Sequence, residues 1–319
     1  MFDLTWQITI GKFTLTMLES VTIVRSVEQL SDTAEIVLPG SCFNKAIEVE
    51  GKIKRGNNVT IKAGYDGKFE TEFTGFLEAI ATDDGSIKLI CEDGIFNFRK
   101  PIKDKEFTNP DVKDLLNYVC SQVKGYTLSC DYSFKYDKYV IKGNTGHDIL
   151  KKIQDETKAN IYIKETTSGK VLHVHPQYKE VFGKAKYSYQ ENIEKSELEY
   201  KIAEDRPFEV IVEGKGLDGK VIRETAGNKG GDSETIKREG VSDRASLKKL
   251  AEEYAKRKSY TGYSGSFTGW LIPFCDAGYK VKITDADYKI KDGEYYVLSV
   301  ETKISSAGGE RKITVGAKI

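Results

Sequence analysis

The stretch GNNVTIKAGYDGKFETEFTGFLEAIATDDGSIKLICED, residues 56–93, decides the fold, because residues 278–319 repeat its layout. Both stretches begin with the pattern Gly-x-x-Val-x-Ile, at Gly56 and at Gly278. In each pattern, Val and Ile have the period-two alternation of a strand, and the glycine that precedes them is typical of a turn. The sequence therefore predicts one supersecondary unit that is used twice.

The spacing within the two copies also agrees. Fourteen residues after the Val of each pattern, an aromatic residue opens a long alternating run: Phe73 follows Val59, and Tyr295 follows Val281. A glycine-bearing turn and a final strand complete each copy. These turns are predicted at Asp83-Asp84-Gly85 and Ala307-Gly308-Gly309.

Length and composition limit the class of protein. A chain of 319 residues predicts two or three domains, and its 39% hydrophobic content suffices for folded cores. The 49 basic and 49 acidic residues cancel, which leaves no global field to attract nucleic acid or anionic membranes. No apolar run approaches the roughly 20 residues of a membrane-spanning helix, and the N-terminus lacks the features of a signal peptide. We therefore expect a soluble protein made in the cytoplasm, without stable membrane insertion.

The five cysteines are scattered and form no Cys-x-x-Cys pair, so buried free thiols are expected. They are Cys42, Cys91, Cys120, Cys130 and Cys275.

Residues 1–100 read as one antiparallel β-barrel domain. Apolar residues alternate with polar ones from Trp6 to Ile10, and Gly11-Lys12 is a plausible tight turn to the next strand. After an interruption at residues 27–33 the alternation resumes before the first copy of the repeat. Closing such a sheet removes its exposed edges.

Residues 101–195 change character and predict a small inserted α+β domain. Asn109 is expected to cap a helix with Pro110 at its first position. Its inward face should carry Val112, Leu115, Leu116, Val119 and Val123. A strand at 126–130, a second helix at 145–158 and a hairpin formed by 161–163 and 171–174 complete this domain.

Residues 196–319 predict a second, similar antiparallel β-barrel domain that is interrupted by a helix at about 243–258. The second copy is expected to consist of two pieces, 196–242 and 261–319, on either side of that helix. Within the first piece, the polar and glycine-rich residues 224–242 predict an exposed, mobile loop. The fold class is thus α+β and mainly β: two similar β-barrels with an inserted α+β domain.

One motif suggests nucleotide binding. Gly214-Lys215-Gly216-Leu217-Asp218-Gly219 matches the dinucleotide fingerprint, which requires a following helix to hold the pyrophosphate. The next residues, Lys220 to Arg223, continue as strand, and Asp218-Gly219 is a strong hairpin turn. The hairpin interpretation is therefore favoured, and no cofactor is expected.

His173 and His175 lie two apart on a predicted strand, so both could approach one metal ion, but zinc needs further ligands. His147 is the only other histidine and has no acidic partner at helical ligand spacing. Structural or surface histidines are therefore expected rather than a metal site.

Three acidic pairs could serve a glycosidase, but they are expected at a turn, on an outward helical face and near a strand end. They are Asp83/Asp84, Glu252/Glu253 and Asp285/Asp287. Neither a nucleophile elbow nor a Walker loop occurs in the sequence. We expect no catalytic residue and no enzyme.

Two aromatic runs leave binding roles open. Residues 96–100 (Phe-Asn-Phe-Arg-Lys) could stack on a single nucleic-acid strand, although core aromatics with flanking charges are commoner at a domain boundary. Residues 260–270 could belong to an adhesin, and burial of Phe267 and Trp270 would remove support for that reading.

Taken together, the order of elements resembles the tail hub proteins of contractile-tailed phages and phage-derived particles. This group includes the late-control D family, the XkdQ-like hubs of defective prophages and the N-terminal part of VgrG in type VI secretion. The resemblance covers nearly the whole chain. It rests on Gly56-x-x-Val59-x-Ile61 leading to Phe73-Thr74-Gly75-Phe76, on Ile90-Cys91-Glu92-Asp93, on the helix at 243–258 and the strand at 262–270, and on Gly278-x-x-Val281-x-Ile283 leading to Gly293-Glu294-Tyr295-Tyr296.

The resemblance implies a homotrimer in which each subunit supplies two tube-like barrels, so that six similar positions surround an axis. Such a ring joins the hexameric tail tube to the central spike and contacts baseplate proteins, and it recognises no specific nucleic-acid sequence. VgrG proteins continue into an OB-fold and a spike, whereas this chain stops at Ile319, so the spike is expected to be a separate polypeptide. No catalytic residue follows from the resemblance. A tail-tip peptidoglycan hydrolase and a carbohydrate- or receptor-binding module remain as alternatives.

The repeat also makes a prediction about side-chain direction. Core-facing positions should be Val59, Ile61, Val281 and Ile283, and outward positions should be Thr60, Lys62, Lys280 and Lys282.

Overall fold

The computed structural model describes residues 3–39, 53–83, 86–166, 169–176, 178–205, 207–289 and 292–319. Over these ranges the chain is mainly β with three α-helices, as predicted. It forms two compact units that interleave along the sequence. Unit 1 comprises Met1–Phe96, Phe182–Leu198 and Gly265–Val315, and unit 2 comprises Asn97–Val181, Glu199–Ser264 and Gly316–Ile319. The division into domains at 1–100, 101–195 and 196–319 stays a prediction.

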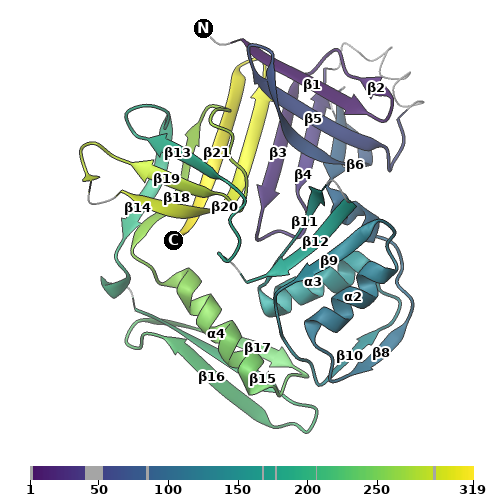
Figure 1. Cartoon of the computed structure of the whole chain (residues 1–319), viewed down its shortest axis with the longest axis vertical. Coiled ribbons are helices and arrows are strands. Elements are labelled where there is room, and N and C mark those ends of the chain that lie inside the picture. Colours follow the sequence, from purple (N-terminus) through teal and green to yellow (C-terminus); the bar gives the residue numbers. More distant parts are fainter. Residues whose placement is uncertain are drawn as a thin grey trace. The chain divides into compact units, whose positions relative to one another are not determined.

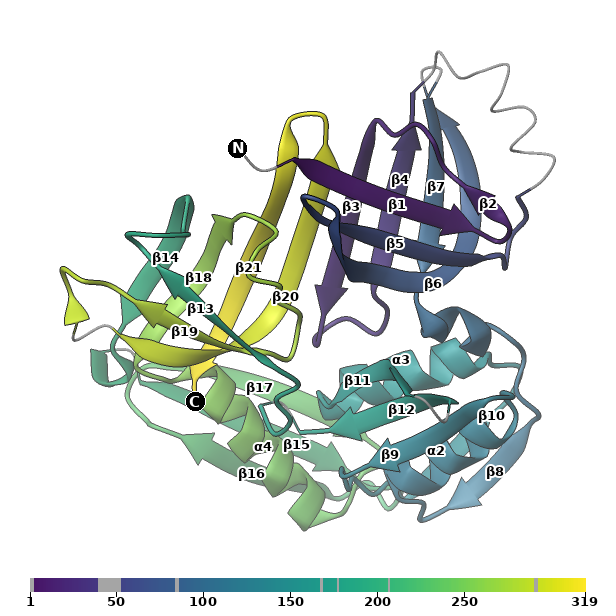
Figure 2. The ribbon, with the colours of Figure 1, turned by 45° about the horizontal axis from the view of Figure 1, so that its top comes forward.

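The N-terminal half of unit 1 is an antiparallel sheet with the strand order β3-β4-β7-β6-β5-β1-β2. The first two strands are joined by a tight turn whose Gly11 has a φ of 60°, which confirms the predicted turn. In Figure 2, β1, β5 and β6 cross over β3, β4 and β7, so this sheet is strongly curved. Its strands are β1 (Leu4–Ile10), β2 (Phe13–Thr14), β3 (Ser20–Ser26), β4 (Thr33–Leu38), β5 (Asn58–Tyr65), β6 (Lys68–Asp83) and β7 (Ser86–Glu92).

The C-terminal half of unit 1 continues the same sheet, because β20 pairs with β3. From β20 the order runs through β21 and β18 to β14, while β19 pairs with β20 and with β13. The pairing of β13 with β19 is parallel, so this half is not purely antiparallel. Its strands are β13 (Lys184–Ser188), β14 (Lys195–Lys201), β18 (Gly262–Gly269), β19 (Lys280–Thr284), β20 (Gly293–Ser305) and β21 (Gly308–Lys318).

The predicted inward residues lie in cores. Val59, Ile61, Val281 and Ile283 are all buried. Inward residues of β1, β3, β4, β5, β6 and β7 share one hydrophobic cluster, which lies on the apolar face of the curved sheet. Each such side chain contributes roughly 1.5–3 kcal/mol. Thr60, Lys62 and Lys280 are partly exposed and Lys282 is exposed, so the predicted register is confirmed.

Unit 2 begins with a 3-10 turn, η2 (Gly94–Phe98), that spans the boundary between the units. A three-stranded sheet of order β11-β12-β9 then packs against α2 and α3, and β8 pairs with β10 (Figure 1). The predicted strand, second helix and hairpin are all present. These elements are β8 (Lys105–Thr108), α2 (Val112–Ser121), β9 (Tyr126–Cys130), β10 (Lys138–Ile141), α3 (Gly146–Thr157), β11 (Asn160–Thr166) and β12 (Gly169–His175).

The start of α2 differs from the prediction by two residues. Asp111 is the N-cap and forms a capping box with Asp114, whereas Asn109 adopts a φ of 49°. The reciprocal side-chain bonds of the capping box satisfy two helix donors at once, and the Asn-Pro pair offers no such arrangement. The predicted inward face is nevertheless buried from Val112 to Val123.

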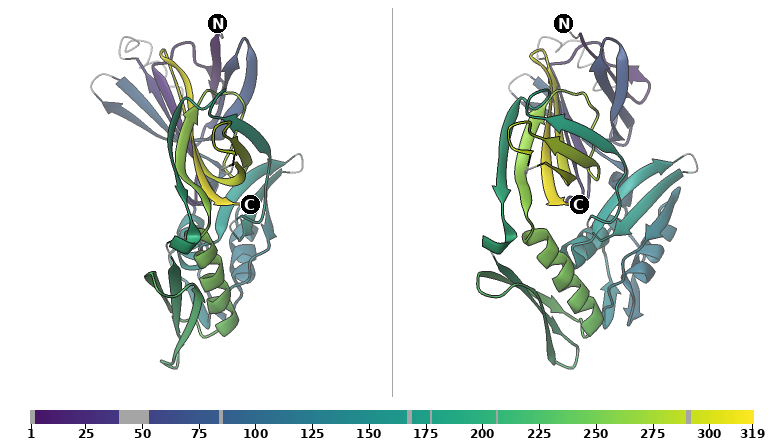
Figure 3. Two further views of the ribbon diagram at one scale, coloured as in Figure 1. Left: turned by 90° about the vertical axis from the view of Figure 1, so that its left-hand side faces the viewer. Right: turned by 60° about the vertical axis from the view of Figure 1, so that its left-hand side comes forward.

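A separate three-stranded sheet of order β16-β15-β17 completes unit 2. One face of this sheet is covered by α4, which is visible in Figure 3. Residues 224–242 were expected to form an exposed, mobile loop, and the loop expectation is wrong. They form the end of β16 and the whole of β17, which runs parallel to β15. The elements are η3 (Ala203–Asp205), β15 (Phe208–Lys215), β16 (Val221–Gly227), β17 (Asp232–Glu239) and α4 (Arg244–Lys258).

Candidate functional site

The duplication is visible in backbone hydrogen bonds around two glycines of unit 1. In the first copy, the N–H of Gly56 donates to the carbonyl of Leu77 at 2.8 Å; in the second, the N–H of Gly278 donates to the carbonyl of Val297 at 2.9 Å. The N–H of Leu77 and that of Val297 each donate back to the residue after the glycine, at 2.9 Å. Both glycines have positive φ, 89° and 81°, a conformation that favours glycine. The two corners are therefore built alike.

The fourteen-residue spacing does not mark equivalent positions. Val59 pairs with Gly75, whereas Val281 pairs with Tyr295. Gly75 therefore occupies the place of Tyr295, and the proposed match of Phe73 with Tyr295 is wrong by two residues. The ring of Phe73 lies only 2.7 Å from where a Cβ on Gly75 would stand. An aromatic ring thus covers this part of the strand in both copies, although it comes from a different residue.

A buried ion pair joins the two halves of unit 1. Arg311 on β21 and Glu72 on β6 approach to 2.5 Å, and their side chains are 0% and 3% exposed. Arg311 also donates to the carbonyls of Leu271 at 2.7 Å and Pro273 at 3.2 Å. Burial raises the pKa of Glu72, although the neighbouring arginine charges oppose this. Removing one partner of such a desolvated pair strongly destabilises the folded protein, because the other charge stays buried without compensation.

A second ion pair lies beside the first. Arg25 on β3 contacts Asp276 at 2.7 Å, and both side chains are 13% exposed. The ring of Phe274 lies under both guanidinium groups, at 5.8 Å from Arg25 and 4.9 Å from Arg311. Desolvation alone would lower the pKa of Arg25, but the nearby carboxylates raise it. The residues that form this junction cluster are Arg25, Glu72, Phe274, Asp276 and Arg311.

The glycine-rich motif at 214–219 forms the predicted hairpin. Gly219 has a φ of 80°, and its N–H donates to the carbonyl of Gly216 at 3.0 Å. The chain continues directly as β16. The helix N-terminus that a pyrophosphate would need does not follow this turn.

His173 and His175 share one face of β12, as predicted, and lie next to a tyrosine and a glutamate. The hydroxyl of Tyr162 lies 2.6 Å from His175 Nε2 and donates to Glu180 at 2.9 Å, while the ring of Tyr162 stacks on His173. Burial lowers the pKa of both histidines. His147 lies 3.9 Å from Asp148. Among the described residues, no group of three or more His, Cys, Asp or Glu side chains is arranged to hold a metal ion.

In the two acidic pairs whose side chains are described, Glu252 and Asp287 are exposed and Glu253 and Asp285 are partly exposed. Glu252 and Glu253 pair with lysines one helical turn earlier, and Asp285 accepts a hydrogen bond from Gln190. Asp84 lies outside the described residues.

Most aromatic residues of the two runs pack internally. Phe96 stacks on Phe76 at 5.4 Å, and Phe98 packs edge-on against Tyr126 at 4.9 Å. Phe267 is buried, but Trp270 is 44% exposed. The rings of Phe96 and Phe98 therefore already stack on other residues of the protein. Of the large aromatic residues on which the adhesin hypothesis rested, Trp270 is exposed, and its indole N–H donates to Glu194.

The described cysteines are free, and burial raises the pKa of Cys91, Cys120 and Cys275 to about 12. Cys42 lies outside the described residues. A thiol with so high a pKa stays protonated and is a poor nucleophile. Within the described ranges, no helix is both long enough and apolar enough to cross a membrane.

Comparisons with known proteins agree with the fold. No family model matches the chain, and no curated protein matches it. Solved structures, in contrast, do match the chain. The tail protein of Neisseria meningitidis MC58 is 15% identical, with a TM-score of 0.65 over 99% of this chain and 96% of that one. The 43 kDa tail protein of prophage MuSo2 from Shewanella oneidensis is 16% identical, with a TM-score of 0.66 over 99% and 98%. A type VI secretion component of E. coli, described as similar to the T4 tail proteins gp27 and gp5, is 7% identical, with a TM-score of 0.61 over 98% and 76%. The chain thus has the fold of these tail proteins.

Proposed function

We propose that this protein is a structural hub of a contractile phage tail or of a phage-like injection particle. The observation that carries the proposal is the duplicated glycine corner in unit 1, within a fold shared over nearly the whole chain with tail proteins. Three subunits with two similar halves each supply six similar positions around an axis. A trimer could then join a hexameric tail tube on one side to a threefold spike on the other.

This role requires the two halves of one subunit to keep a fixed relation. Two features of unit 1 provide it: the continuous sheet through β20 and β3, and the junction cluster around Arg311. Sheet pairing and a desolvated ion pair both depend strongly on geometry. The expected partners are other copies of the chain, the tube protein, the spike and baseplate proteins, all in the assembled particle.

Measuring the mass of the purified protein by sedimentation, alone and with its tube protein, tests the proposal. We expect a trimer, or a monomer that becomes a trimer once the tube protein is added. A stable dimer that ignores the tube protein would contradict the hub.

An enzymatic role as a peptidoglycan hydrolase makes a different prediction. Zymography on cell-wall material should show no clearing, because Glu252 and Glu253 already pair with lysines of α4. A cleared zone that survives mutation of these carboxylates to amides would point to a contaminant, and one that disappears would favour the hydrolase.

A receptor-binding role rests on one observation, the exposed Trp270. If this residue bound carbohydrate, sugars would change the tryptophan fluorescence, and Trp270→Phe would abolish that change. Because the indole N–H already donates to Glu194, we expect no response to sugars.

A further inference from the structure

The paired strands β13 and β19 of unit 1 carry two aligned rows of lysines. In the parallel register, Lys184 lies opposite Lys280, and Lys186 lies opposite Lys282. The residues that alternate with these lysines point into the core: Ala185, Tyr187, Val281 and Ile283 are buried. Because side chains alternate along a strand, all four lysines must share the outward face. We call Lys184, Lys186, Lys280 and Lys282 the lysine face.

The positive charge on the lysine face is only partly balanced within the described part of the chain, where Glu294 interacts with Lys280, Lys282 and Lys184. Lys280 pairs with Glu294 at 2.8 Å. The other three ammonium groups have no carboxylate within 4.0 Å among the described residues. Like charges placed opposite each other across two strands destabilise a sheet. The four lysines therefore lower the stability of this pair of strands, and their repulsion is not explained by the fold alone.

The first copy shows that the fold does not need these lysines. There, β1 takes the place next to β5 that β13 takes next to β19, and the outward pairs are Thr9 with Thr60 and Gln7 with Lys62. One lysine stands where the second copy has four. The lysine face is therefore a property of the second copy alone.

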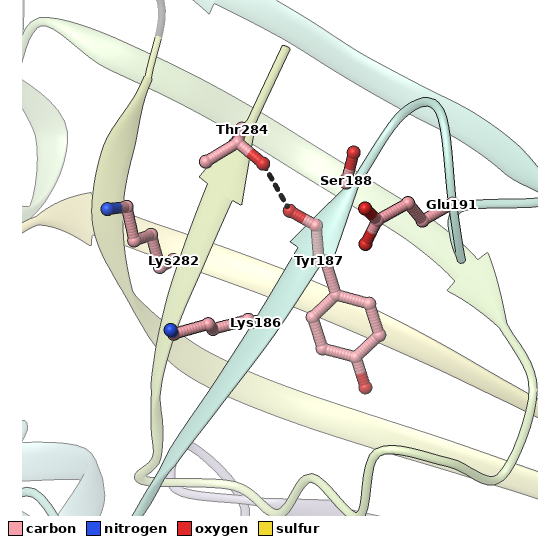
Figure 4. Close-up of a pocket in the computed structure, with 6 residues that line it drawn as sticks. All are labelled: Lys186, Tyr187, Ser188, Glu191, Lys282 and Thr284. Atoms are coloured by element: carbon pink, nitrogen blue, oxygen red, sulfur yellow. Dashed lines mark hydrogen bonds between the residues drawn. The ribbon is translucent and has the colours of Figure 1, made fainter. Parts of the chain in front are cut away.

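A pocket of about 220 Å³ lies beside two of these lysines, and Figure 4 shows the residues that line it. The side chains of Lys186 and Lys282 extend to the same side of the two strands. The pocket is also lined by Tyr187, Ser188, Glu191 and Thr284. The hydroxyl of Ser188 donates to Gln190, and that of Thr284 donates to the carbonyl of Tyr187. The two ammonium groups outnumber the one carboxylate at this pocket, that of Glu191, so the pocket favours the carboxylate oxygens of a partner.

We propose that the lysine face binds an acidic strand or loop of a partner protein. Neighbouring lysines on one strand are about 6.6 Å apart, and the two rows are about 4.8 Å apart, which matches carboxylates at alternate positions of an extended chain. Nucleic acid is less suited, because the face offers neither an arginine fork nor an exposed aromatic ring: Tyr187 is buried. That the partner is a tail component rests on the proposed function; the acidic chemistry does not.

The experiment measures binding of the full chain to a labelled fifteen-residue poly-glutamate peptide by fluorescence anisotropy at low and moderate salt. A fifteen-nucleotide single strand and a fifteen-base-pair duplex are tested in parallel. We expect the peptide to bind in a salt-dependent manner, and Lys186→Gln/Lys282→Gln to weaken binding by about threefold to tenfold, since each exposed ion pair contributes modestly. Lys186→Arg/Lys282→Arg, which keeps the charge, should retain the affinity.

The matched control is Lys124→Gln/Lys142→Gln, which removes two exposed lysines of unit 2. It should leave the affinity within about twofold of the unchanged protein, because neither ammonium group belongs to the lysine face and a single exposed charge contributes little. Equal losses in both glutamine variants, no peptide binding at all, or tighter binding of either oligonucleotide would overturn the proposal. Because binding is measured on the protein whatever its oligomeric state, failure here is distinguishable from failure of the trimer test.

Discussion

The guanidinium of Arg311 is fully buried, and its partner Glu72 lies 239 residues away in the sequence. Removing one member leaves the other charge buried without compensation. Arg311→Met or Glu72→Leu alone should therefore lower the free energy of unfolding by about 3–5 kcal/mol. The double variant should lose clearly less than the sum of the two single losses, because no buried charge remains.

Urea unfolding of the four proteins gives this double-mutant cycle directly. The control is the exposed pair of Lys303 and Glu301, whose nitrogen and oxygen are 2.6 Å apart. Neutralising either of these should change the free energy of unfolding by no more than about 1 kcal/mol. Additive losses at Arg311 and Glu72 would mean that the two residues act independently, contrary to the geometry.

The same pair shows why the junction cluster was not predicted from the sequence. Glu72 is the residue skipped where the pairing of β5 with β6 shifts register, and Arg311 is in phase with the buried Ile313 of β21, so a charged side chain stands at a core-facing position. They are buried because the two halves meet at these faces. Periodicity within one strand reports which residues share a face, but it cannot report what later covers that face.

At the scale of elements, local signals predicted α3 well. Thr145 caps the helix, and its hydroxyl and the carboxylate of Asp148 form a capping box. Thr145→Ala should cost about 1 kcal/mol in thermal or urea unfolding. Lys151→Ala, an exposed change in the same helix, serves as the control and should cost less than about 0.5 kcal/mol.

The cap also predicts a pH dependence. Hydrogen bonds from Thr145 lower the pKa of Asp148 in the folded protein. A carboxyl whose pKa is lower when folded contributes stability that is present above its unfolded pKa and is lost as the pH falls through the folded value. The difference in stability between the unchanged protein and Thr145→Ala should therefore shrink on acidification. A constant difference from pH 7 down to pH 2 would show that the carboxylate takes no part.

The failed loop prediction at 224–242 has a physical reason. In β17 only Ile236 is both apolar and buried, and the preceding residues are rich in glycine. An edge strand that pairs with β15 on one side and carries mostly polar side chains gives almost no hydrophobic alternation. The strand forms because β15 and α4 already provide a sheet and a core, which is tertiary information.

At the scale of the whole molecule, the repeat was predicted correctly as a duplication, and the buried sets at Val59, Ile61, Val281 and Ile283 follow from period-two alternation. The register between the copies was not predictable, because Gly75 replaces Tyr295 and the ring comes from Phe73 instead. The interleaving of the two units was also missed. The register between the copies and the interleaving of the units both depend on contacts between segments far apart in the sequence. The local pattern of residues carries no information about these contacts.

The continuous sheet of unit 1 makes a final prediction about the chain as a whole. β20 pairs with β3 along seven residues, from Ser299 opposite Ser26 to Ser305 opposite Ser20. Deleting residues 265–319 would remove this partner and leave β3 as an exposed, unpaired edge, which promotes aggregation. The same deletion would leave Glu72 and Arg25 without Arg311 and Asp276. We therefore expect the shortened protein to be insoluble or to sediment as large aggregates.

A chain lacking only Lys318 and Ile319, which are exposed at the C-terminus, is the control and should sediment like the complete protein. In the complete protein, hydrogen exchange should protect the amides of β3 as well as those of β4, because both strands have a partner on each side. A soluble chain lacking residues 265–319, with β3 amides still protected, would show that the N-terminal half is stable alone. The fixed relation between the halves would then not depend on their shared sheet, and the basis for six equivalent positions in a trimer would be weakened.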